Sequence, residues 1–472
     1  MKAKIFLGSE AKSTQEQIEV KNPYNANVVS TYSICTQDDV KMAYLKAKSA
    51  SKEAKNSPLH QRVSWLEDVA HRLEEQKDKF AKLICDEVGK PMMFARGEVT
   101  RCIETIRLSA HTMISIGGES FDTTAMPSGK KSLSFYRRVP VGVALAITPF
   151  NFPLNLVAHK IAPALVSGNS VVLKPSSAAP LCAYSLAKLF IESPYAIKDA
   201  LSVVYSGKGV NEALVKSRTP RVISFTGSVP VGKTIMSQAG IKKVALELGG
   251  NAATFIDKSA NLKDAAAKCA VGAFVNSGQV CISLQRIYVH VEVYDEFAKL
   301  LSEETKKLVV GNPYDEKTFI GPMIDEDAVD KAKIWIANAL QEGAKVLTGG
   351  ENRGLVMEPT IMVDVKEDMN IVCQEVFAPI VSLIAKESYK DAKESMNDSE
   401  YGLQYSVFTN DLKISLDAIE ELEAGGVVVN DIPTLRFDIQ PYGGFKHSGI
   451  GKEGPKFAIL DDYTQIKSVV VL

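Results

Sequence analysis

The sequence predicts an α/β protein with two alternating series of strands and helices. Between residues 141 and 246, short runs rich in Val, Ile and Leu alternate with helical segments, and the connections are short. A second alternating series follows from residue 262. Parallel strands joined by helices form a sheet covered on both faces, which binds ligands beyond the carboxyl ends of its strands. At 472 residues the chain is long enough for two or three domains.

Helices are expected first, over residues 37 to 115. Segments 38–54 and 58–88 have apolar residues spaced three and four apart, with charged residues between them. The first alternating series then begins. Its expected strands are 141–148, 170–174, 200–205, 222–226 and 243–246, and its expected helices are 154–167, 180–191, 211–217 and 231–239.

The second series contains the remaining expected elements. They are helices at 262–277, 293–308 and 325–342, a strand at 286–291, strands near Ile380 and Val407, and a last strand within 425–430. Two segments fit neither series, the alternating strand 131–138 and the apolar tail 464–472. An apolar terminal strand exposes an edge unless something pairs with it. We expect it to pair with another subunit, and pairing within the chain is the alternative.

Composition excludes several classes of function. Lys and Arg number 55 against 56 Asp and Glu, so the net charge is −1, and neither nucleic acid nor an anionic membrane is an expected partner. The seven Cys form no CxxC pair and the six His no ligand-spaced cluster, so we expect no metal site and no disulfide framework. The first residues lack the apolar run of a signal peptide, and no apolar stretch is long enough to span a bilayer. A cytoplasmic protein with reduced thiols is therefore expected.

One stretch combines a carboxylate with a thiol in Gly-containing apolar surroundings. Glu247 precedes Leu-Gly-Gly, and Cys281 follows Asn-Ser-Gly-Gln-Val. A thiolate adds to a carbonyl carbon, and a carboxylate can then take a proton from water. Taken singly, the Cys is more typical of a buried core residue and the Glu of a solvated charge.

Two polar residues stand at predicted strand ends. Asn151 follows the strand that ends near Thr148, where its amide could donate to an oxyanion, or simply cap a turn. Lys174 ends the next strand, where its amine could bond ribose hydroxyls, or be an ordinary surface charge.

The segment Gly227–Thr234 supports a different class of protein. It matches G-x-x-x-x-G-K-[ST], the phosphate-binding loop of NTPases, and lies between a predicted strand and a predicted helix. An apolar strand ending in a magnesium-binding Asp is missing, Asp257 being the nearest candidate. A helix N-terminus also stabilises the pyrophosphate of a dinucleotide, which is the interpretation we favour.

Seven motifs together resemble the aldehyde dehydrogenase superfamily, in its order and spacing and over essentially the whole chain. They are Glu247-Leu-Gly-Gly, Gly278-Gln-Val-Cys, Thr148-Pro-Phe-Asn-Phe-Pro, Lys174-Pro-Ser, Phe225-Thr-Gly-Ser, Glu375-Val-Phe-Ala-Pro and Pro441-Tyr-Gly-Gly-Phe-Lys-His-Ser-Gly. The sequence is most similar to the branch of lactaldehyde dehydrogenases and non-phosphorylating glyceraldehyde-3-phosphate dehydrogenases. This resemblance implies a Rossmann-like cofactor domain (1–119 and 139–249), an α/β catalytic domain (250–451) and a small β oligomerisation element (120–138 and 452–472). It also implies a homodimer or homotetramer.

The resemblance implies a role for each matching residue. Cys281 would be the nucleophile, Asn151 and the Cys281 backbone N–H the oxyanion hole, and Glu247 the base that activates the deacylating water. Lys160 would lie where it can tune the thiol. NAD or NADP would be held by the strand-end and loop residues Thr148, Pro149, Phe150, Lys174, Ser177, Gly207, Phe225, Thr226, Gly227, Ser228, Gly232, Leu248, Glu375 and Phe377. A family-like protein with only a structural role is the third alternative, which the intact Cys281, Glu247 and Asn151 oppose.

Two positions depart from the family pattern. Ser177 stands where strictly NAD-preferring members have Glu, so a 2′-phosphate would meet no carboxylate there and NADP is slightly favoured. Val280 stands where glyceraldehyde-3-phosphate enzymes have Arg, which makes a phosphorylated substrate less favoured.

Arg436 lies in the segment that resembles the family's substrate-anchor loop. It could bind an acidic group bidentately, or form a structural ion pair with Asp431 or Asp438. The expected substrate is a short polar or anionic aldehyde, such as lactaldehyde or a semialdehyde.

Overall fold

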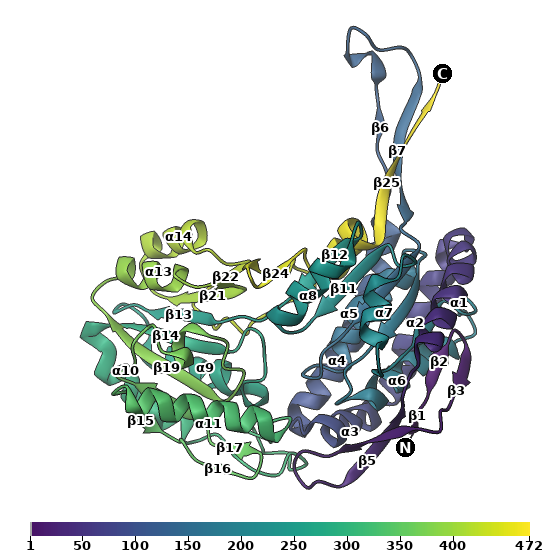
Figure 1. Cartoon of the computed structure of the whole chain (residues 1–472). Coiled ribbons are helices and arrows are strands. Elements are labelled where there is room, and N and C mark those ends of the chain that lie inside the picture. Colours follow the sequence, from purple (N-terminus) through teal and green to yellow (C-terminus); the bar gives the residue numbers. More distant parts are fainter. Residues whose placement is uncertain (1) are drawn as a thin grey trace.

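The computed structural model describes residues 2–472, which form two lobes and a projecting arm (Figure 1). Each lobe has one large sheet with helices on both faces, and the arm is a separate three-stranded sheet. The chain passes from the first sheet to the second through residues 248–251, between β12 (Lys243–Glu247) and β13 (Ala252–Ile256), and returns to the first sheet at β24 (Gly449–Ile450). The α/β class with two alternating series is confirmed.

The first lobe is built on an eight-stranded sheet in the order β24-β12-β11-β8-β9-β10-β2-β3. Its central five strands are parallel, and β24, β2 and β3 pair antiparallel at the edges. Besides β12, its strands are β2 (Ile5–Leu7), β3 (Glu10–Lys12), β8 (Val143–Ile147), β9 (Ser170–Lys174), β10 (Leu201–Val203), β11 (Val222–Thr226) and β24 (Gly449–Ile450). A small sheet in the order β1-β5-β4 flanks this lobe, with β1 (Lys2–Ala3), β4 (Gln17–Lys21) and β5 (Val28–Ser33). The central strands are almost wholly buried, as expected when helices cover both faces.

Two helix layers cover this sheet. One contains α2 (Leu59–Glu75), α3 (Lys77–Val88), α4 (Met92–Ser115), α5 (Asn155–Val166) and α6 (Pro180–Ile191). The other contains α1 (Gln37–Asn56), α7 (Val210–Lys216) and α8 (Val229–Ala239). A capping box between Thr36 and Asp39 fixes the start of α1. The continuous periodicity of 58–88 hides a break at Gln76, which separates α2 from α3.

The second lobe is built on a seven-stranded sheet in the order β15-β18-β19-β14-β13-β21-β22. All its strands are parallel except β15. Besides β13, they are β14 (Leu284–His290), β15 (Lys345–Thr348), β18 (Thr360–Val363), β19 (Ile380–Lys386), β21 (Gln404–Phe408) and β22 (Gly426–Val429). Two short ladders pair β16 (Asn352–Arg353) with β17 (Val356–Met357) and β20 (Tyr401–Gly402) with β23 (Phe445–Lys446).

Helices of the second lobe bury two separate apolar clusters against its sheet. On one face lie α9 (Leu262–Phe274) and α10 (Tyr294–Thr305). On the other lie α11 (Glu326–Gln341), α12 (Asn370–Cys373), α13 (Tyr389–Asn397) and α14 (Leu412–Glu421). Short 3₁₀ turns cover Thr123–Ala125, Val275–Gly278 and Val291–Val293.

The expected helix 262–277 is too long. The helix α9 ends at Phe274, and Asn276 and Ser277 then adopt left-handed backbone angles, with φ of 52° and 55°. Left-handed φ is costly for non-glycine residues and is held only where surrounding contacts fix it. The pattern of apolar residues could not reveal this turn, because Val275 and Val280 continue the helical spacing on both sides of it.

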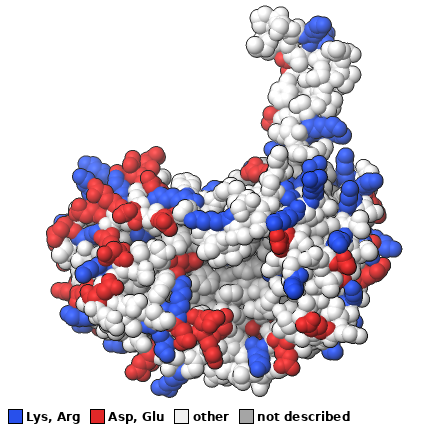
Figure 2. Space-filling model, in the orientation of Figure 1, with Lys and Arg blue, Asp and Glu red and all other residues white. Residues whose placement is uncertain are grey.

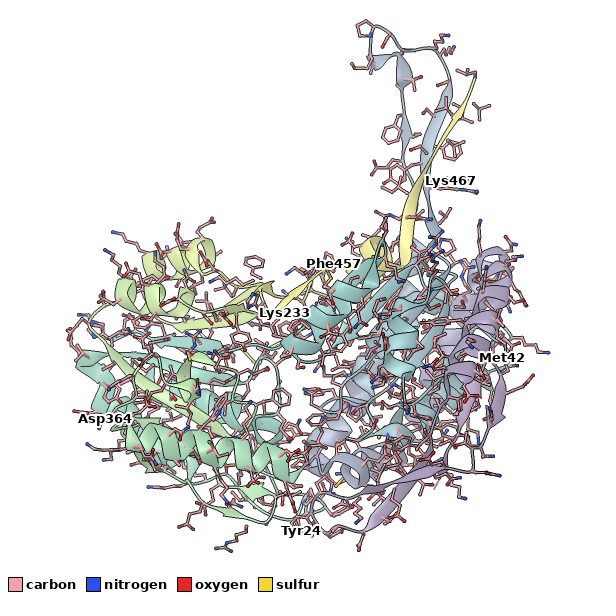
Figure 3. All side chains as sticks on the ribbon, viewed as in Figure 1. Tyr24, Met42, Lys233, Asp364, Phe457 and Lys467 are labelled. Carbon is pink, nitrogen blue, oxygen red and sulfur yellow. The ribbon has the colours of Figure 1, made fainter. Side chains whose placement is uncertain are left out.

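The arm joins the C-terminal strand to the segment after α4. It contains β6 (Ser120–Phe121), β7 (Leu133–Pro140) and β25 (Thr464–Val471), in the order β25-β7-β6. Every residue of β25 pairs antiparallel with β7, so the terminal strand pairs within the chain, and our expectation of pairing with another subunit is wrong for this edge. Its other edge remains free among residues 2–472 (Figure 3). Before the arm, α15 (Pro455–Phe457) and a π-helical turn (Ala458–Tyr463) pack on α4 and α5.

No helix within residues 2–472 is both long and apolar enough to cross a membrane. The same residues contain no group of His, Cys, Asp and Glu side chains placed to hold a metal ion.

Candidate active site

A cavity of about 950 Å³ lies between the two lobes, where Figure 2 shows the surface hollowed. Its walls contain residues that follow strands of the first sheet and residues that precede or follow strands of the second. Asn151, Glu247 and Cys281 all line it. The residues that the sequence singled out as a chemical set are therefore brought together at one cavity.

Cys281 lies just before β14, at the end of the left-handed turn. A Cβ on Gly278 would lie 2.0 Å from the Ala378 carbonyl oxygen, so only glycine allows this close approach. Ser277 fixes the turn from the other side by donating to the Gly321 carbonyl at 2.9 Å. Burial raises the pKa of the Cys281 thiol to about 12, and a hydrogen bond with the Tyr442 hydroxyl opposes this rise.

Glu247 is the last residue of β12. Gly250 lies three residues later, and a Cβ on it would lie 2.3 Å from the Cys281 carbonyl oxygen. The segment that follows Glu247 therefore packs directly against the backbone of Cys281. Its side chain is buried, and its Oε2 has no hydrogen-bond partner within the described chain. Burial, and next the charge of Glu453, raise the pKa of Glu247 well above the ordinary value. A buried carboxyl with an unused oxygen facing a cavity is suited to bind a water molecule.

Asn151 lies in the turn between β8 and α5. Its side-chain Nδ2 donates to the Gln279 carbonyl at 3.0 Å, which ties the turn to the segment that carries Cys281. The Asn276 amide in turn donates to the Asn151 carbonyl at 3.4 Å. The second hydrogen on Nδ2 remains available to an oxygen in the cavity.

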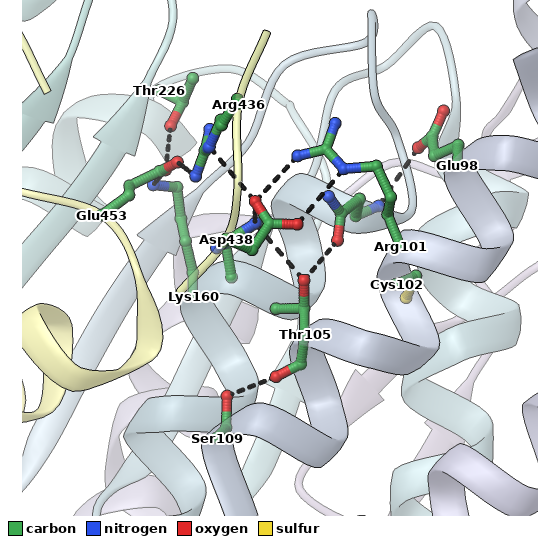
Figure 4. Close-up of polar contacts among 12 residues, drawn as sticks. Glu98, Arg101, Cys102, Thr105, Ser109, Lys160, Thr226, Arg436, Asp438 and Glu453 are labelled. Atoms are coloured by element: carbon green, nitrogen blue, oxygen red, sulfur yellow. Dashed lines mark hydrogen bonds and ion pairs between the residues drawn. The ribbon is translucent and has the colours of Figure 1, made fainter. Parts of the chain in front are cut away.

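A charge cluster that the sequence did not predict surrounds Glu453 (Figure 4). Its Oε1 lies 3.2 Å from both Lys160 Nζ and Thr226 Oγ1, and its Oε2 accepts from Arg436 at 3.2 Å. Although burial alone would raise it, Lys160 and Arg436 hold the pKa of Glu453 at about 2. Lys160 also donates to Ser224, so it contacts Glu453 rather than the thiol.

Arg436 lines the cavity and is engaged in ion pairs with Asp438 and Glu453, both at 3.2 Å. The expected ion pair with Asp438 is present, whereas Asp431 pairs with Lys268. Asp438 also binds Arg101 of α4 at 2.8 Å, so two guanidinium groups share this carboxylate (Figure 4). Arg101 lines the cavity too. Sequence reasoning missed it, because an Arg on an amphipathic helix looks like a surface charge.

The expected cofactor residues other than Glu375 and Phe377 gather at the carboxyl edge of the first sheet. Part of the whole expected set lines the cavity directly: Pro149, Phe150, Thr226, Gly227, Ser228, Leu248, Glu375 and Phe377. The other expected residues do not line the cavity but lie at or just after strand ends, or in α8. They are Thr148, Lys174, Ser177, Gly207, Phe225 and Gly232.

Several unused polar groups at this edge fit a dinucleotide. The Thr148 hydroxyl is buried without a hydrogen-bond partner in residues 2–472, and burial lowers the pKa of Lys174. Ser228 begins α8 but its side chain makes no capping bond, so its hydroxyl and the first N–H groups are free for an anion. A Cβ on Gly232 would lie 2.6 Å from Leu248 Cδ2, so glycine allows the helix start to lie close to the strand end.

Glu375 and Phe377 approach from the second lobe. Glu375 Oε1 accepts from the Gly250 N–H at 3.0 Å, and burial raises its pKa to about 7. Phe377 has a left-handed φ of 54° and packs edge-on against Phe150, with ring centroids 6.1 Å apart. The two lobes thus meet around the expected nicotinamide position.

The backbone at Gly227–Thr234 differs from that of an NTPase loop. The helix α8 already begins at Val229, so Gly232, Lys233 and Thr234 lie inside it. Lys233 is exposed on this helix (Figure 3), and the Thr234 hydroxyl donates to the Pro230 carbonyl. Since these residues wind into a helix, they leave no extended loop to surround a triphosphate.

Comparison with known proteins agrees with this geometry. The profile of the aldehyde dehydrogenase family matches residues 10–469. A 3-sulfolactaldehyde dehydrogenase of Priestia aryabhattai is 43% identical over 468 residues, covering 99% of this chain and 97% of the relative. A lactaldehyde dehydrogenase of Methanococcus aeolicus is 40% identical and covers 99% of both chains. The crystal structure of an NADP-dependent glyceraldehyde-3-phosphate dehydrogenase from Bacillus halodurans, complexed with NADP, superimposes with a TM-score of 0.97 at 33% identity, covering 100% of this chain and 99% of that one.

The chain therefore belongs to the aldehyde dehydrogenase family. It is an oxidoreductase that oxidises an aldehyde with NAD or NADP, and the NTPase alternative is set aside.

Proposed function

We propose that this enzyme oxidises a short polar aldehyde, preferably one with an anionic group, to the free carboxylic acid. One observation carries the choice of substrate. The Tyr442 hydroxyl lies 3.0 Å from Cys281 Sγ, and the Arg436 guanidinium lies 3.7 Å from the centre of the same ring. A cation one phenol ring away from the thiol matches an aldehyde whose anionic group is a few atoms from its carbonyl.

Cys281 is the nucleophile in this proposal. Its thiolate attacks the aldehyde carbon to form a thiohemiacetal, and the carbonyl electron pair moves to oxygen. Asn151 and the Cys281 backbone N–H stabilise that oxyanion. The bond between Asn151 and the Gln279 carbonyl supports this role, because it fixes the amide beside the nucleophile segment.

Glu247 is the base for the second half-reaction. Loss of hydride leaves a thioester on Cys281, which water must hydrolyse to release the acid. The raised pKa of Glu247 supports its role, since a carboxyl with a higher pKa takes a proton from water more readily.

NAD or NADP accepts the hydride when it is bound. The residues proposed to hold it share the carboxyl edge of the first sheet and the facing segment of the second lobe. Lys174 and Ser177 contact the adenosine ribose, Ser228 and the start of α8 the pyrophosphate, and Glu375 the nicotinamide ribose, with Phe377 against the ring. The unpartnered hydroxyl of Thr148 and the uncapped start of α8 support this assignment.

Positive charge supports an anionic substrate. Three cations pair with only two carboxylates, so the ion pairs of this cluster leave one positive charge in excess. The cations are Arg101, Arg436 and Lys160, and the carboxylates are Asp438 and Glu453. The Priestia relative is named for a sulfonated aldehyde, whereas the Methanococcus relative is named for lactaldehyde, which has no charge. Val280 supplies no cation beside the thiol, and this favours a smaller anion than a phosphate ester.

Kinetics with matched aldehydes test the proposal. We would compare lactaldehyde and glycolaldehyde with 3-sulfolactaldehyde, succinic semialdehyde and glyceraldehyde 3-phosphate, in wild type and in Arg101→Ala and Arg436→Ala. Loss of a hydrogen bond to a charged group should lower kcat/KM for the anionic aldehydes by about tenfold or more, and that for the neutral ones far less. Arg107→Ala is the control, since Arg107 lies on the same helix and pairs with Glu74 outside the cavity. Equal losses on neutral and anionic aldehydes would refute the substrate choice, and dehydrogenase activity in Cys281→Ala would refute the nucleophile.

The assembly proposed is a cytoplasmic homodimer or homotetramer. The proposed division assigns residues 1–119 and 139–249 to a dinucleotide-binding domain, 250–451 to a catalytic domain, and 120–138 with 452–472 to an oligomerisation element, with β24 and residues 455–463 packed on the first of these. The free edge of β25 and the exposed side chains of Phe121, Ile466 and Val470 on the arm support self-association, since an unpaired apolar edge recruits another chain. Light scattering should give the mass of two or four chains, and Ile466→Lys with Val470→Lys should reduce it.

A further inference from the structure

The Tyr442 hydroxyl is the side-chain hydrogen-bond partner of the candidate nucleophile Cys281. It lies 3.0 Å from Cys281 Sγ, and Tyr442 is only 6% exposed. Within residues 2–472 this thiol is the hydroxyl's hydrogen-bond partner. The residue lies in the segment between β22 and β23 and lines the cavity, and its backbone pairs with Glu453, which follows β24.

The direction of this hydrogen bond follows from the charge on sulfur. A thiol and a phenol can each donate, but a thiolate has no proton and only accepts. Whenever Cys281 is charged, the Tyr442 hydroxyl is therefore the donor. A hydrogen bond to a charged acceptor is stronger than one to a neutral acceptor, so the contact favours the thiolate over the thiol.

The charged groups that face Cys281 make this donor important. Glu247 from β12 and Glu375 from the segment after α12 both raise the pKa of the thiol, in addition to the larger effect of burial. The Tyr442 hydrogen bond and, next, the Arg436 charge lower it. Arg436 stacks on the Tyr442 ring at 3.7 Å, and a cation over the face of a phenol draws electron density from it and strengthens its O–H as a donor.

We propose that Tyr442 is a catalytic residue, whose hydroxyl donates a hydrogen bond to the Cys281 sulfur and holds it as a correctly placed thiolate before attack. The proposal rests on Cys281 being the nucleophile. As the sulfur lone pair forms the bond to carbon and the carbonyl electron pair moves to oxygen, negative charge leaves the sulfur. The hydrogen bond then weakens, and Tyr442 keeps its proton throughout.

This role has a pH signature that simple packing lacks. Losing a donor to a charged sulfur should move the thiol titration to higher pH by about one unit. The thiolate fraction near neutrality then falls about tenfold, but the remaining thiolate is about threefold more nucleophilic because its proton affinity is higher. The net result is a reaction about threefold slower near neutrality.

Tyr442→Phe tests this, because it removes one oxygen and keeps the ring under Arg436. Cys373 is partly exposed whereas Cys35, Cys85, Cys102, Cys182 and Cys269 are buried, so the measurements are made in a Cys373→Ser background. The readouts are ultraviolet absorbance of the thiolate and the rate of alkylation by iodoacetamide, each across pH and each corrected with Cys281→Ala. In Tyr442→Phe we expect the thiol titration to move to higher pH by about one unit and alkylation near neutrality to be about threefold slower. We expect kcat/KM to follow the same pH profile.

Tyr405→Phe is the matched control, since it also removes a buried hydroxyl in the second lobe, one that donates to the Tyr401 carbonyl at 3.0 Å. It should leave the titration of Cys281 unchanged. An unshifted titration in folded Tyr442→Phe, or alkylation as fast as in wild type near neutrality, overturns the proposal. Both readouts are independent of turnover, so this failure is distinct from the failure of the proposed function, which Cys281→Ala activity reveals.

Discussion

Lys90 and Glu98 form an ion pair in which neither side chain is exposed. Glu98 uses its other oxygen to accept from the backbone N–H groups of Leu154 and Asn155, at 2.8 and 3.2 Å. It thereby satisfies the first turn of α5, the helix that follows Asn151. Lys90 lies 3.7 Å from the centre of the Phe152 ring on the same turn. The pair therefore fixes the turn that carries the proposed oxyanion donor.

Removing the cation alone should be strongly destabilising. Lys90→Met leaves the Glu98 charge buried and without its counter-charge, which typically costs about 3–5 kcal/mol of unfolding free energy. The double variant Lys90→Met with Glu98→Gln should recover part of that loss. Denaturant unfolding measures both, and Lys82→Met, at an exposed pair with Asp86, should cost about 1 kcal/mol or less. A double variant less stable than Lys90→Met would contradict this account of the pair.

Glu247→Gln should separate the two half-reactions. The amide preserves the shape of the site but cannot take a proton from water, so the thioester should accumulate after one rapid turnover. We expect a burst of about one equivalent of reduced cofactor and steady-state turnover lower by about 10²–10⁴-fold, the usual size of a general-base contribution. Stopped-flow absorbance measures both phases. Hydroxylamine, which attacks thioesters directly, should restore turnover; a burst-free variant with wild-type turnover would show that another group activates the water.

Ser177→Glu should shift the cofactor preference toward NAD. Ser177 follows β9, its hydroxyl 3.4 Å from that of Ser206, and a carboxylate there would repel a 2′-phosphate held by Lys174. We expect kcat/KM with NADP to fall about tenfold or more, while that with NAD changes little. Initial rates with both cofactors give the ratio, and Ser237→Glu on α8 is the control for an added surface charge. An unchanged ratio would mean that position 177 does not face the ribose.

Glu453 should contribute a pH-dependent part of the stability. Its pKa of about 2 lies below the ordinary carboxyl value, because Lys160 and Arg436 outweigh the opposing effect of burial. A lowered folded-state pKa stabilises the fold above the unfolded pKa, and that stabilisation is lost as pH falls from about 4.5 toward 2. Glu453→Gln should thus be most destabilising near neutrality, and its difference from wild type should shrink across this acidic range. Urea midpoints measured from neutral to acidic pH test this, with exposed Glu400→Gln as control; a constant difference would disprove the assigned charge state.

Short strands and their helices could be predicted because the patterns are local. The strands β9 and β11 and the helix α6 have the predicted bounds, since Gly, Pro and Ser mark their ends in the sequence. Residues 2–36 contain five strands that no prediction included, because they are short, and β2 takes its partner β10 from a distant segment. The break between α2 and α3 at Gln76 was missed for the opposite reason, since the apolar spacing continues through it.

The sequence predicts those site residues to which a motif assigns a role, but not those that only long-range packing brings to the site. Cys281, Glu247 and Asn151 stand in recognisable contexts, and the fold brings all three to one cavity. Tyr442 stands in one of the seven motifs, but the motif assigned it no role, and Arg101 had no signal because an Arg on a helix is common in any soluble chain. Only the tertiary structure shows that one contacts the thiol and the other shares a carboxylate with Arg436.

The four residues between β12 and β13 couple the position of the Glu247 carboxylate to that of the Cys281 thiol across the two lobes. Glu247 ends a strand of the first sheet and Cys281 precedes a strand of the second, so base and thiol belong to different lobes. The Glu375 carboxylate spans the same seam by accepting from Gly250. A rotation of one lobe against the other would therefore change the separation of the carboxylate and the thiol. A remote substitution that tightens or loosens this seam should then affect the proposed hydrolysis step, which needs the carboxylate as well as the thiol, more than the proposed attack of the thiol.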